Sequence, residues 1–141
     1  MFRTKRVGLG AIALLMSLAA HSALADAVAV VSSRSAVRAL SKSQVADIFL
    51  GKVRRFPDGA QAVPIDQAEG SGTRNEIYEK VTGKSPAQLK AHWSKIIFTG
   101  RGQPPKSVLD GIEVKKRIAA DTNAIGYIEK SQLDASVREV L

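Results

Sequence analysis

Short apolar runs, separated by segments with helical spacing, organise the chain from residue 27 to its last residue. Residues 27–31 are apolar without a break, which is typical of a strand buried on both faces. Similar runs predict further strands at about 62–65, 124–128 and 137–141. Between these runs the apolar positions recur every three to four residues, as they do on one face of a helix.

Capping signals mark where the predicted helices start and end. At the start of three periodic segments, serine or aspartate stands three residues before glutamine or glutamate. The three pairs are Ser41 with Gln44, Ser85 with Gln88, and Asp110 with Glu113. Gly51 and Gly83 follow helical segments, where a glycine commonly ends the helix. Residues 98–105 contain two glycines and two prolines and are predicted to form a loop.

Strands that alternate with helices predict an α/β fold, in which helices pack on a mainly parallel or mixed β-sheet. The sequence shows no internal repeat, no low-complexity tract and no second domain. We therefore expect a single domain within residues 26–141.

The first 25 residues form a separate pattern. Three basic residues among the first six precede an uncharged apolar segment, 7–20, and the small-residue pattern Ala23-Leu24-Ala25. This order is typical of a signal peptide that is cleaved after Ala25. A membrane anchor is the alternative, but the apolar segment is shorter than the roughly 20 residues that a span needs. We expect an exported, periplasmic protein that has no stable membrane span after cleavage.

Composition narrows the class of protein only partly. The chain contains no cysteine, so an exported form must rely on packing rather than on disulfides. Removal of three of the 21 basic residues leaves 18 against 13 acidic ones, a net charge of +5. A small basic domain favours anionic ligands, nucleic acid or an acidic membrane surface, and charge alone does not choose among them.

The segment Glu69-Gly70-Ser71-Gly72-Thr73-Arg74 has the strongest chemical signature in the chain. It lies between the predicted strand at 62–65 and a predicted helix whose apolar residues include Ile77 and Val81. Two glycines and two hydroxyl side chains at such a turn can direct several N–H and O–H groups to one point. The helix dipole is positive there, so the turn suits an oxyanion, and Arg74 adds a cation.

Ordinary helix capping is a second interpretation of these residues. Thr73 and Glu76 have the spacing of a capping box, with Gly70 and Gly72 easing the turn. One glycine would suffice for a cap, whereas a second one lets a ligand approach the backbone closely. Glu69 disfavours the oxyanion interpretation, because a carboxylate repels an anion. The segment also lacks the Gly-Lys-Ser/Thr ending of a nucleotide P-loop, which argues against nucleotide hydrolysis.

Other candidate sites are weaker. His92 is the one histidine in residues 26–141 and the chain has no cysteine, so neither a metal cluster nor a catalytic triad is expected. The basic clusters at 54–55 and 115–117 are expected on solvated surfaces. Nucleic-acid binding would favour aromatic residues interleaved with the basic ones, and aromatic residues are scarce. We expect a protein that is not an enzyme and has no cofactor, no metal and no nucleic-acid partner.

Several segments, taken in order, resemble the PstS-like family, periplasmic phosphate-binding proteins that feed ABC transporters. They are Leu-Ser-Lys-Ser-Gln-Val-Ala-Asp-Ile-Phe-Leu-Gly at 40–51, the turn at 69–74, Trp93, Phe-Thr-Gly at 98–100 and Ala-Ile-Gly-Tyr-Ile at 124–128. The resemblance spans nearly all of residues 26–141 and implies one lobe of a type II periplasmic binding protein. It also implies that Ser71, Gly72 and Thr73 match the phosphate-binding turn of that family.

Two departures from the family pattern affect the implied site. Members of the family that carry phosphate bind it between two lobes, whereas this chain has room for one. Gln67 stands where the family commonly has an arginine that clamps phosphate, and Glu69 replaces an aspartate. The loss of the arginine removes a permanently charged, bidentate contact to the anion. Weak phosphate binding is expected unless another subunit supplies the second wall.

Two functions follow as hypotheses. The first is an exported module that binds phosphate or another small oxyanion and whose partner is an ABC transporter permease or another periplasmic protein. Its ligand-binding residues would be Gln67, Gly70, Ser71, Gly72, Thr73 and Arg74, with Arg74 either adding positive potential or pairing with Glu69. The alternative is a non-transport interaction or sensor protein of the periplasm that has lost high-affinity ligand binding.

Overall fold

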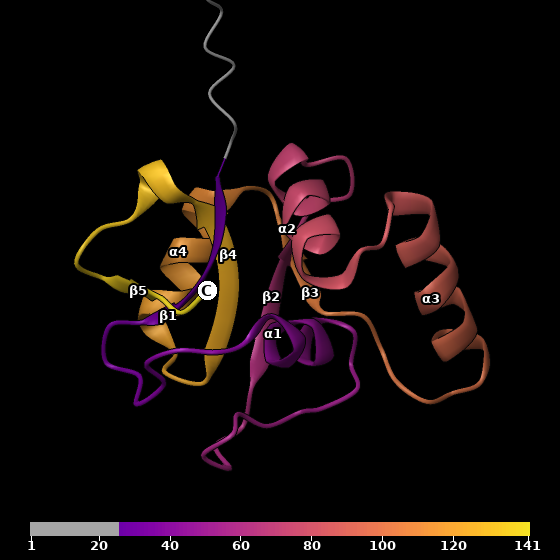
Figure 1. Ribbon diagram of the computed structural model, residues 1–141, viewed down its shortest axis with the longest axis horizontal. Coiled ribbons are helices and arrows are strands. Elements are labelled where there is room, and N and C mark those ends of the chain that lie inside the picture. The colour runs from indigo at the N-terminus through magenta and orange to yellow at the C-terminus, as the bar shows by residue number, and fades with distance from the viewer. Residues whose placement is uncertain (1–25) are drawn as a thin grey trace, which may run out of the picture.

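The computed structural model describes residues 26–141, and the predicted signal peptide, 1–25, lies outside the described residues. Within the described residues, five strands and four α-helices follow one another, with helices on both faces of the sheet (Figure 1). The strands are β1 (Ala27–Ser32), β2 (Val63–Gln67), β3 (Lys106–Val108), β4 (Ala124–Glu129) and β5 (Val137–Glu139). The helices are α1 (Lys42–Phe49), α2 (Gly72–Thr82), α3 (Pro86–Phe98) and α4 (Gly111–Ala120), and a 3₁₀ turn spans Lys130–Gln132.

The sheet is mixed. Its strand order is β3-β2-β4-β1-β5. Strand β2 pairs in parallel with both β3 and β4, whereas β1 is antiparallel to both β4 and β5. The parallel neighbours are joined by long connections through α2, α3 and α4, as parallel pairing requires. The predicted α/β class, with helices on a mainly parallel or mixed sheet, is confirmed.

Strand β1 lies inside the sheet and is buried on both faces, as its unbroken apolar run predicted. Ala29 and Val31 belong to the larger apolar core, which α1 and α2 cover. Val28 and Val30 belong to a second core, which α4 covers. Alternate residues of one strand therefore serve two cores, because successive side chains of a strand point to opposite faces.

The predicted helix ends agree with the structure. Capping boxes form at Ser41 and Ser85, and the side chain of Asp110 accepts a hydrogen bond from the backbone N–H of Glu113 at 3.0 Å. Gly51 and Gly83 both have positive φ, at 73° and 67°. Strand β3 was not predicted, because its three residues are largely exposed and form no apolar run. Pairing with β2 defines this edge strand.

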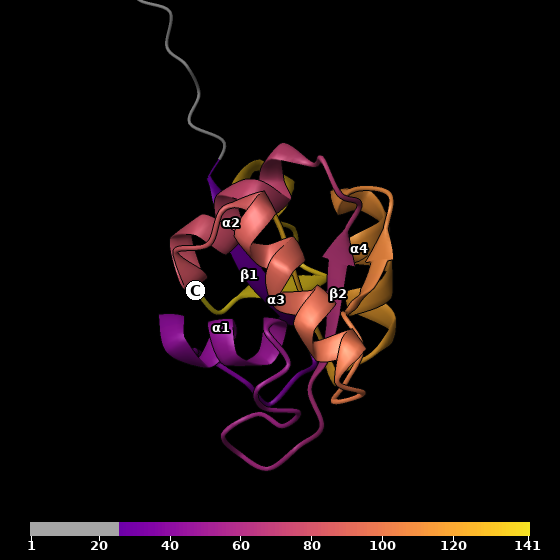
Figure 2. The ribbon, with the colours of Figure 1, turned by 90° about the vertical axis from the view of Figure 1, so that its right-hand side faces the viewer.

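Helix α3 lies at the side of the sandwich rather than flat on the sheet (Figures 1 and 2). Only Leu89 and Trp93 are buried in it. Near its end, Ile97 is 48% exposed and Phe98 is 92% exposed. Within residues 26–141, none of the helices has the length and apolar character needed to cross a membrane.

Candidate oxyanion site

The turn between β2 and α2 is capped by Ser71. Its hydroxyl accepts a hydrogen bond from the backbone N–H of Arg74 at 3.2 Å, and the N–H of Ser71 donates to the carbonyl of Ala68. The capping box considered as the alternative at Thr73 and Glu76 does not form, because the helix begins two residues earlier. Glu76 instead accepts a hydrogen bond from the backbone N–H of Ala27 at 3.2 Å and so ties α2 to β1.

The two glycines leave the front of the turn open. Gly70 has a φ of +92°, which a residue with a side chain rarely adopts. A Cβ atom built at Gly70 or at Gly72 would have no heavy atom within 4 Å. The N–H groups of Gly72 and Thr73 belong to the first helical turn, where N–H groups have no acceptor within the helix. The turn therefore presents backbone donors at the positive end of α2.

Carboxylates lie close to these donors. The hydroxyl of Thr73 contacts Oε1 of Glu129, at the end of β4, at 3.5 Å. Glu69, which precedes the turn, is exposed. Both carboxylates make the electrostatic potential at the turn more negative and so disfavour an anion there, as the sequence suggested for Glu69.

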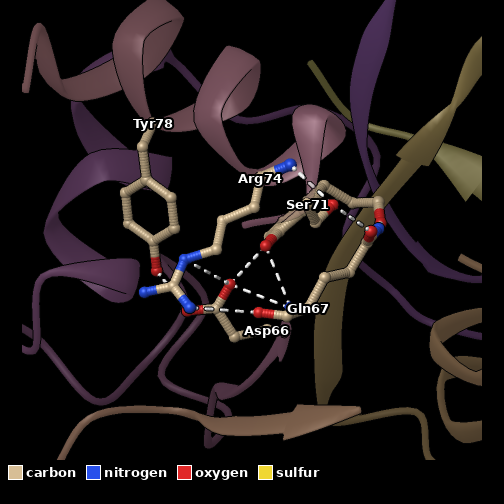
Figure 3. A network of polar contacts seen from close by, with 6 residues as sticks. Asp66, Gln67, Ser71, Arg74 and Tyr78 are labelled. Carbon is tan, nitrogen blue, oxygen red and sulfur yellow. Dashed lines mark hydrogen bonds and ion pairs between the residues drawn. The ribbon is translucent and has the colours of Figure 1, made fainter. Parts of the chain in front are cut away.

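Gln67 and Ser71 are joined to each other. Gln67 is 3% exposed. Its Nε2 donates to the backbone carbonyl of Tyr127 at 3.0 Å, and its Oε1 accepts from the Ser71 hydroxyl at 2.9 Å (Figure 3). Both side chains therefore hold β2, β4 and the start of α2 together.

Arg74 lies against the end of β2 (Figure 3). Its Nη1 donates to the carbonyl of Gln67 at 3.1 Å, and its Nε lies 3.9 Å from Oδ1 of Asp66. The guanidinium carbon is 5.7 Å from the centre of the Tyr78 ring, a distance suited to a cation–π contact. Among the described residues, no ion pair joins Arg74 to Glu69. Pairing with Glu69, one of the two roles considered for Arg74, is thus replaced by pairing with Asp66.

Asp66 is the centre of a buried polar cluster. It is 2% exposed and accepts hydrogen bonds from the hydroxyl of Tyr78 at 2.7 Å, from the hydroxyl of Tyr127 and from the N–H of Gln67 at 2.9 Å. Burial, together with the Asp66 carboxylate, raises the pKa of Tyr78 and that of Tyr127 far above their ordinary value of 10.0. Both phenols therefore remain protonated donors to the carboxylate.

Asp66, Tyr78 and Tyr127 were not predicted to belong to a site. One signal was available, because an aspartate that ends an apolar strand must find donors if it is buried. Which donors it finds depends on the pairing of β2 with β4 and on the position of α2, which the sequence pattern leaves open.

A cavity of about 320 Å³ opens beside this cluster, toward α3. Its charged lining residues are Asp66, Glu69, Arg74 and Lys90. Of the six predicted ligand-binding residues, only Arg74 lines it. The turn donors and this cavity are therefore separate features.

Solved structures with this fold support the resemblance that the sequence motifs indicated. The first is described as a phosphate ABC transporter substrate-binding protein from Clostridium perfringens, solved with bound phosphate, with 26% identity and a TM-score of 0.63. An ABC-type phosphate transport receptor from Vibrio cholerae has 19% identity and a TM-score of 0.62, and PstS from Borrelia burgdorferi has 15% and 0.59. No family model and no curated protein matches the sequence.

Each of these three matches covers 82% of this chain, but only 44%, 45% and 46%, respectively, of the solved chain. The chain therefore spans less than half the length of the proteins that it resembles. It has the fold of one lobe of the PstS-type, type II periplasmic binding proteins.

Proposed function

We propose that this chain is an exported oxyanion-binding module of the kind that serves ABC phosphate uptake systems. Phosphate would bind at the start of α2, to the N–H groups of Gly72 and Thr73 and to the Thr73 hydroxyl. Residues 1–25 would direct export, and the module would comprise residues 26–141. An ABC transporter permease, or another periplasmic protein, would be its partner.

One observation carries this proposal. The chain shares its fold with a protein solved with bound phosphate, and its own turn keeps open space around Gly70 and Gly72 at the positive end of α2. A helix N-terminus with exposed N–H groups is a general anion-binding arrangement. The comparison makes phosphate the anion to test first.

The contacts around the turn favour weak phosphate binding. The side chains of Gln67, Ser71 and Arg74 are engaged with each other and with the backbone, so they are not free donors for a ligand. Glu69 and Glu129 add negative charge nearby. An anion held at an open surface also stays hydrated and screened by salt. We expect saturation only at millimolar phosphate.

A proline at residue 72 gives a sharp test. Gly72 is the first helical residue, where proline is well accommodated, and Ser71 has the extended conformation (φ −61°, ψ 126°) that a residue before proline favours. Gly72→Pro therefore removes one proposed donor and should preserve the helix. In a phosphate titration followed by amide NMR shifts, the wild-type resonances of Gly72 and Thr73 should move and saturate. The variant should bind several-fold more weakly.

Removal of the negative charge of Glu129 is a matched test in the opposite direction, because it should strengthen phosphate binding. Glu129→Gln should tighten phosphate binding roughly two- to three-fold, which is what a unit charge about 7 Å away provides in a largely aqueous environment. If the resonances of Gly72 and Thr73 do not move up to about 10 mM phosphate, the oxyanion function is wrong.

The side chains of Gln67, Ser71 and Arg74 form hydrogen bonds within the protein, which favours a second candidate function. This candidate is a non-transport interaction or sensor protein that has lost high-affinity ligand binding. In that case the purified protein should capture a periplasmic partner without phosphate. The Ser71→Ala/Thr73→Ala variant should capture it equally well, and loss of capture would count against this candidate.

A further inference from the structure

A second cavity, of about 490 Å³, lies apart from the predicted oxyanion site. It lies between the end of α1, the start of β2, the side of α3 and the loop that leads into β3. Its volume falls in the range of small-molecule sites, roughly 300–1,000 Å³. None of the residues of the 69–74 turn lines it.

Apolar side chains form much of the wall. They are Ile48, Val53, Ala62, Val63, Pro64, Trp93, Ile96, Pro104 and Pro105. Val53 is 41% exposed and Ile96 is half-buried, so apolar surface remains in contact with water. The two consecutive prolines restrict the backbone of one wall, which favours a preformed cavity.

The charged residues of this cavity are all basic. Arg54, Arg101 and Lys106 line it, and no aspartate or glutamate does. Within residues 26–141, none of these three cations forms an ion pair. The arrangement is therefore complementary to a single anionic group attached to an apolar body.

Trp93 lines this cavity and also the cavity of about 320 Å³, and within residues 26–141 its indole N–H is unpaired. It is 7% exposed, and its Nε1 is the one buried side-chain nitrogen or oxygen without a hydrogen-bond partner among the described residues. A buried indole N–H usually has a partner. A Cβ atom at Gly51, which also lines the cavity, would lie 2.9 Å from Cη2, 3.5 Å from Cζ3 and 3.9 Å from Cζ2 of Trp93, so the end of the benzene ring remote from Nε1 faces Gly51.

We propose that this cavity binds a small carboxylate with an apolar aliphatic or aryl body. Arg54, Arg101 and Lys106 hold the carboxylate, and the apolar wall covers its body. This site is separate from the oxyanion turn and does not depend on the function proposed for it.

Octanoate and 3-phenylpropionate are suitable probes. Isothermal titration calorimetry of the purified protein should show saturable binding of at least one of them. Octanol, which has the apolar body without the charge, and acetate, which has the charge without the body, should each bind at least 10-fold more weakly. Ligand-induced amide shifts should lie in residues 48–54 and 101–106 and leave the 69–74 turn unchanged.

Two variants test the assignment. Arg54→Ala/Arg101→Ala should weaken carboxylate binding at least 10-fold, whereas Arg117→Ala, at an exposed arginine of α4 outside the cavity, should leave it unchanged. The proposal is overturned if neither acid binds, if octanol binds as tightly as octanoate, or if Arg117→Ala weakens carboxylate binding as much as Arg54→Ala/Arg101→Ala does.

Discussion

Asp66→Ala should be among the most destabilising single substitutions in this fold. The carboxylate is 2% exposed and accepts from two phenol hydroxyls, those of Tyr78 and Tyr127. Each hydrogen bond to a charged acceptor contributes about 1.5–3 kcal/mol, so the loss of two gives about 3–6 kcal/mol. A domain of this kind has roughly 5–15 kcal/mol of total stability. The variant should therefore approach the limit of folding.

Urea denaturation measures this loss directly. Trp93 is the single tryptophan and is buried, so its fluorescence follows unfolding. With a urea dependence of about 1–3 kcal/mol per molar, the midpoint should fall by about 1 M or more. Asp134→Ala is the control, because the Asp134 side chain is 47% exposed and pairs with Lys115 at 2.8 Å near the surface, where an ion pair contributes little.

A double-mutant cycle distinguishes the cluster from a general effect of substitution. Tyr78→Phe alone should cost about 1.5–3 kcal/mol, because it removes one donor to the carboxylate. In the Asp66→Ala background the same change should cost much less, since the hydroxyl no longer has its acceptor. Additive losses would refute the reasoning, as would a midpoint for Asp66→Ala close to that of Asp134→Ala.

Three further outcomes are expected. First, Tyr78 and Tyr127 have a higher pKa in the folded state than in the unfolded state. Their contribution to the free energy of unfolding is therefore complete below about pH 10 and is lost as the pH rises further. For each tyrosine, the free energy of unfolding should fall by about 1.4 kcal/mol per pH unit. Urea titrations from pH 9 to 11.5 measure this fall, and in Tyr78→Phe the part that depends on the two tyrosines should be half as large. Gly51→Ala should destabilise the protein more than Gly83→Ala, because both have positive φ but only a Cβ at Gly51 meets Trp93. A thermal melt compares them, and equal losses would remove the role assigned to that contact. Finally, the intact mass of protein recovered from the periplasm should correspond to a chain that starts at Asp26, and a mass that includes residues 1–25 would contradict the predicted cleavage.

The sequence determined the local elements well. Strand β1 was predictable because every residue of its run is apolar, and burial on both faces requires that composition. The starts of α1, α3 and α4 were predictable because serine or aspartate caps act within four residues of chain. The three-residue strand β3 was not predictable, since pairing with β2 alone defines it.

The turn at 69–74 shows where sequence reasoning about a site stops. Its glycines and hydroxyl residues predicted exposed donors at a helix start, which is local chemistry. The same residue types did not show that Ser71 bonds to Gln67 or that Arg74 lies against Asp66. Those contacts depend on how the end of β2 meets α2.

The sequence by itself thus determined the helices, most of the strands and the open turn, because caps, glycines and apolar periodicity act over a few neighbouring residues. Only the tertiary structure decided which groups stay free for a ligand. It brings Asp66 and Tyr127, 61 residues apart, into one hydrogen-bonded cluster, and it gathers Arg54, Trp93 and Arg101 around one cavity. Such pairings depend on the strand order of the sheet and on the position of α3, and no local pattern encodes either.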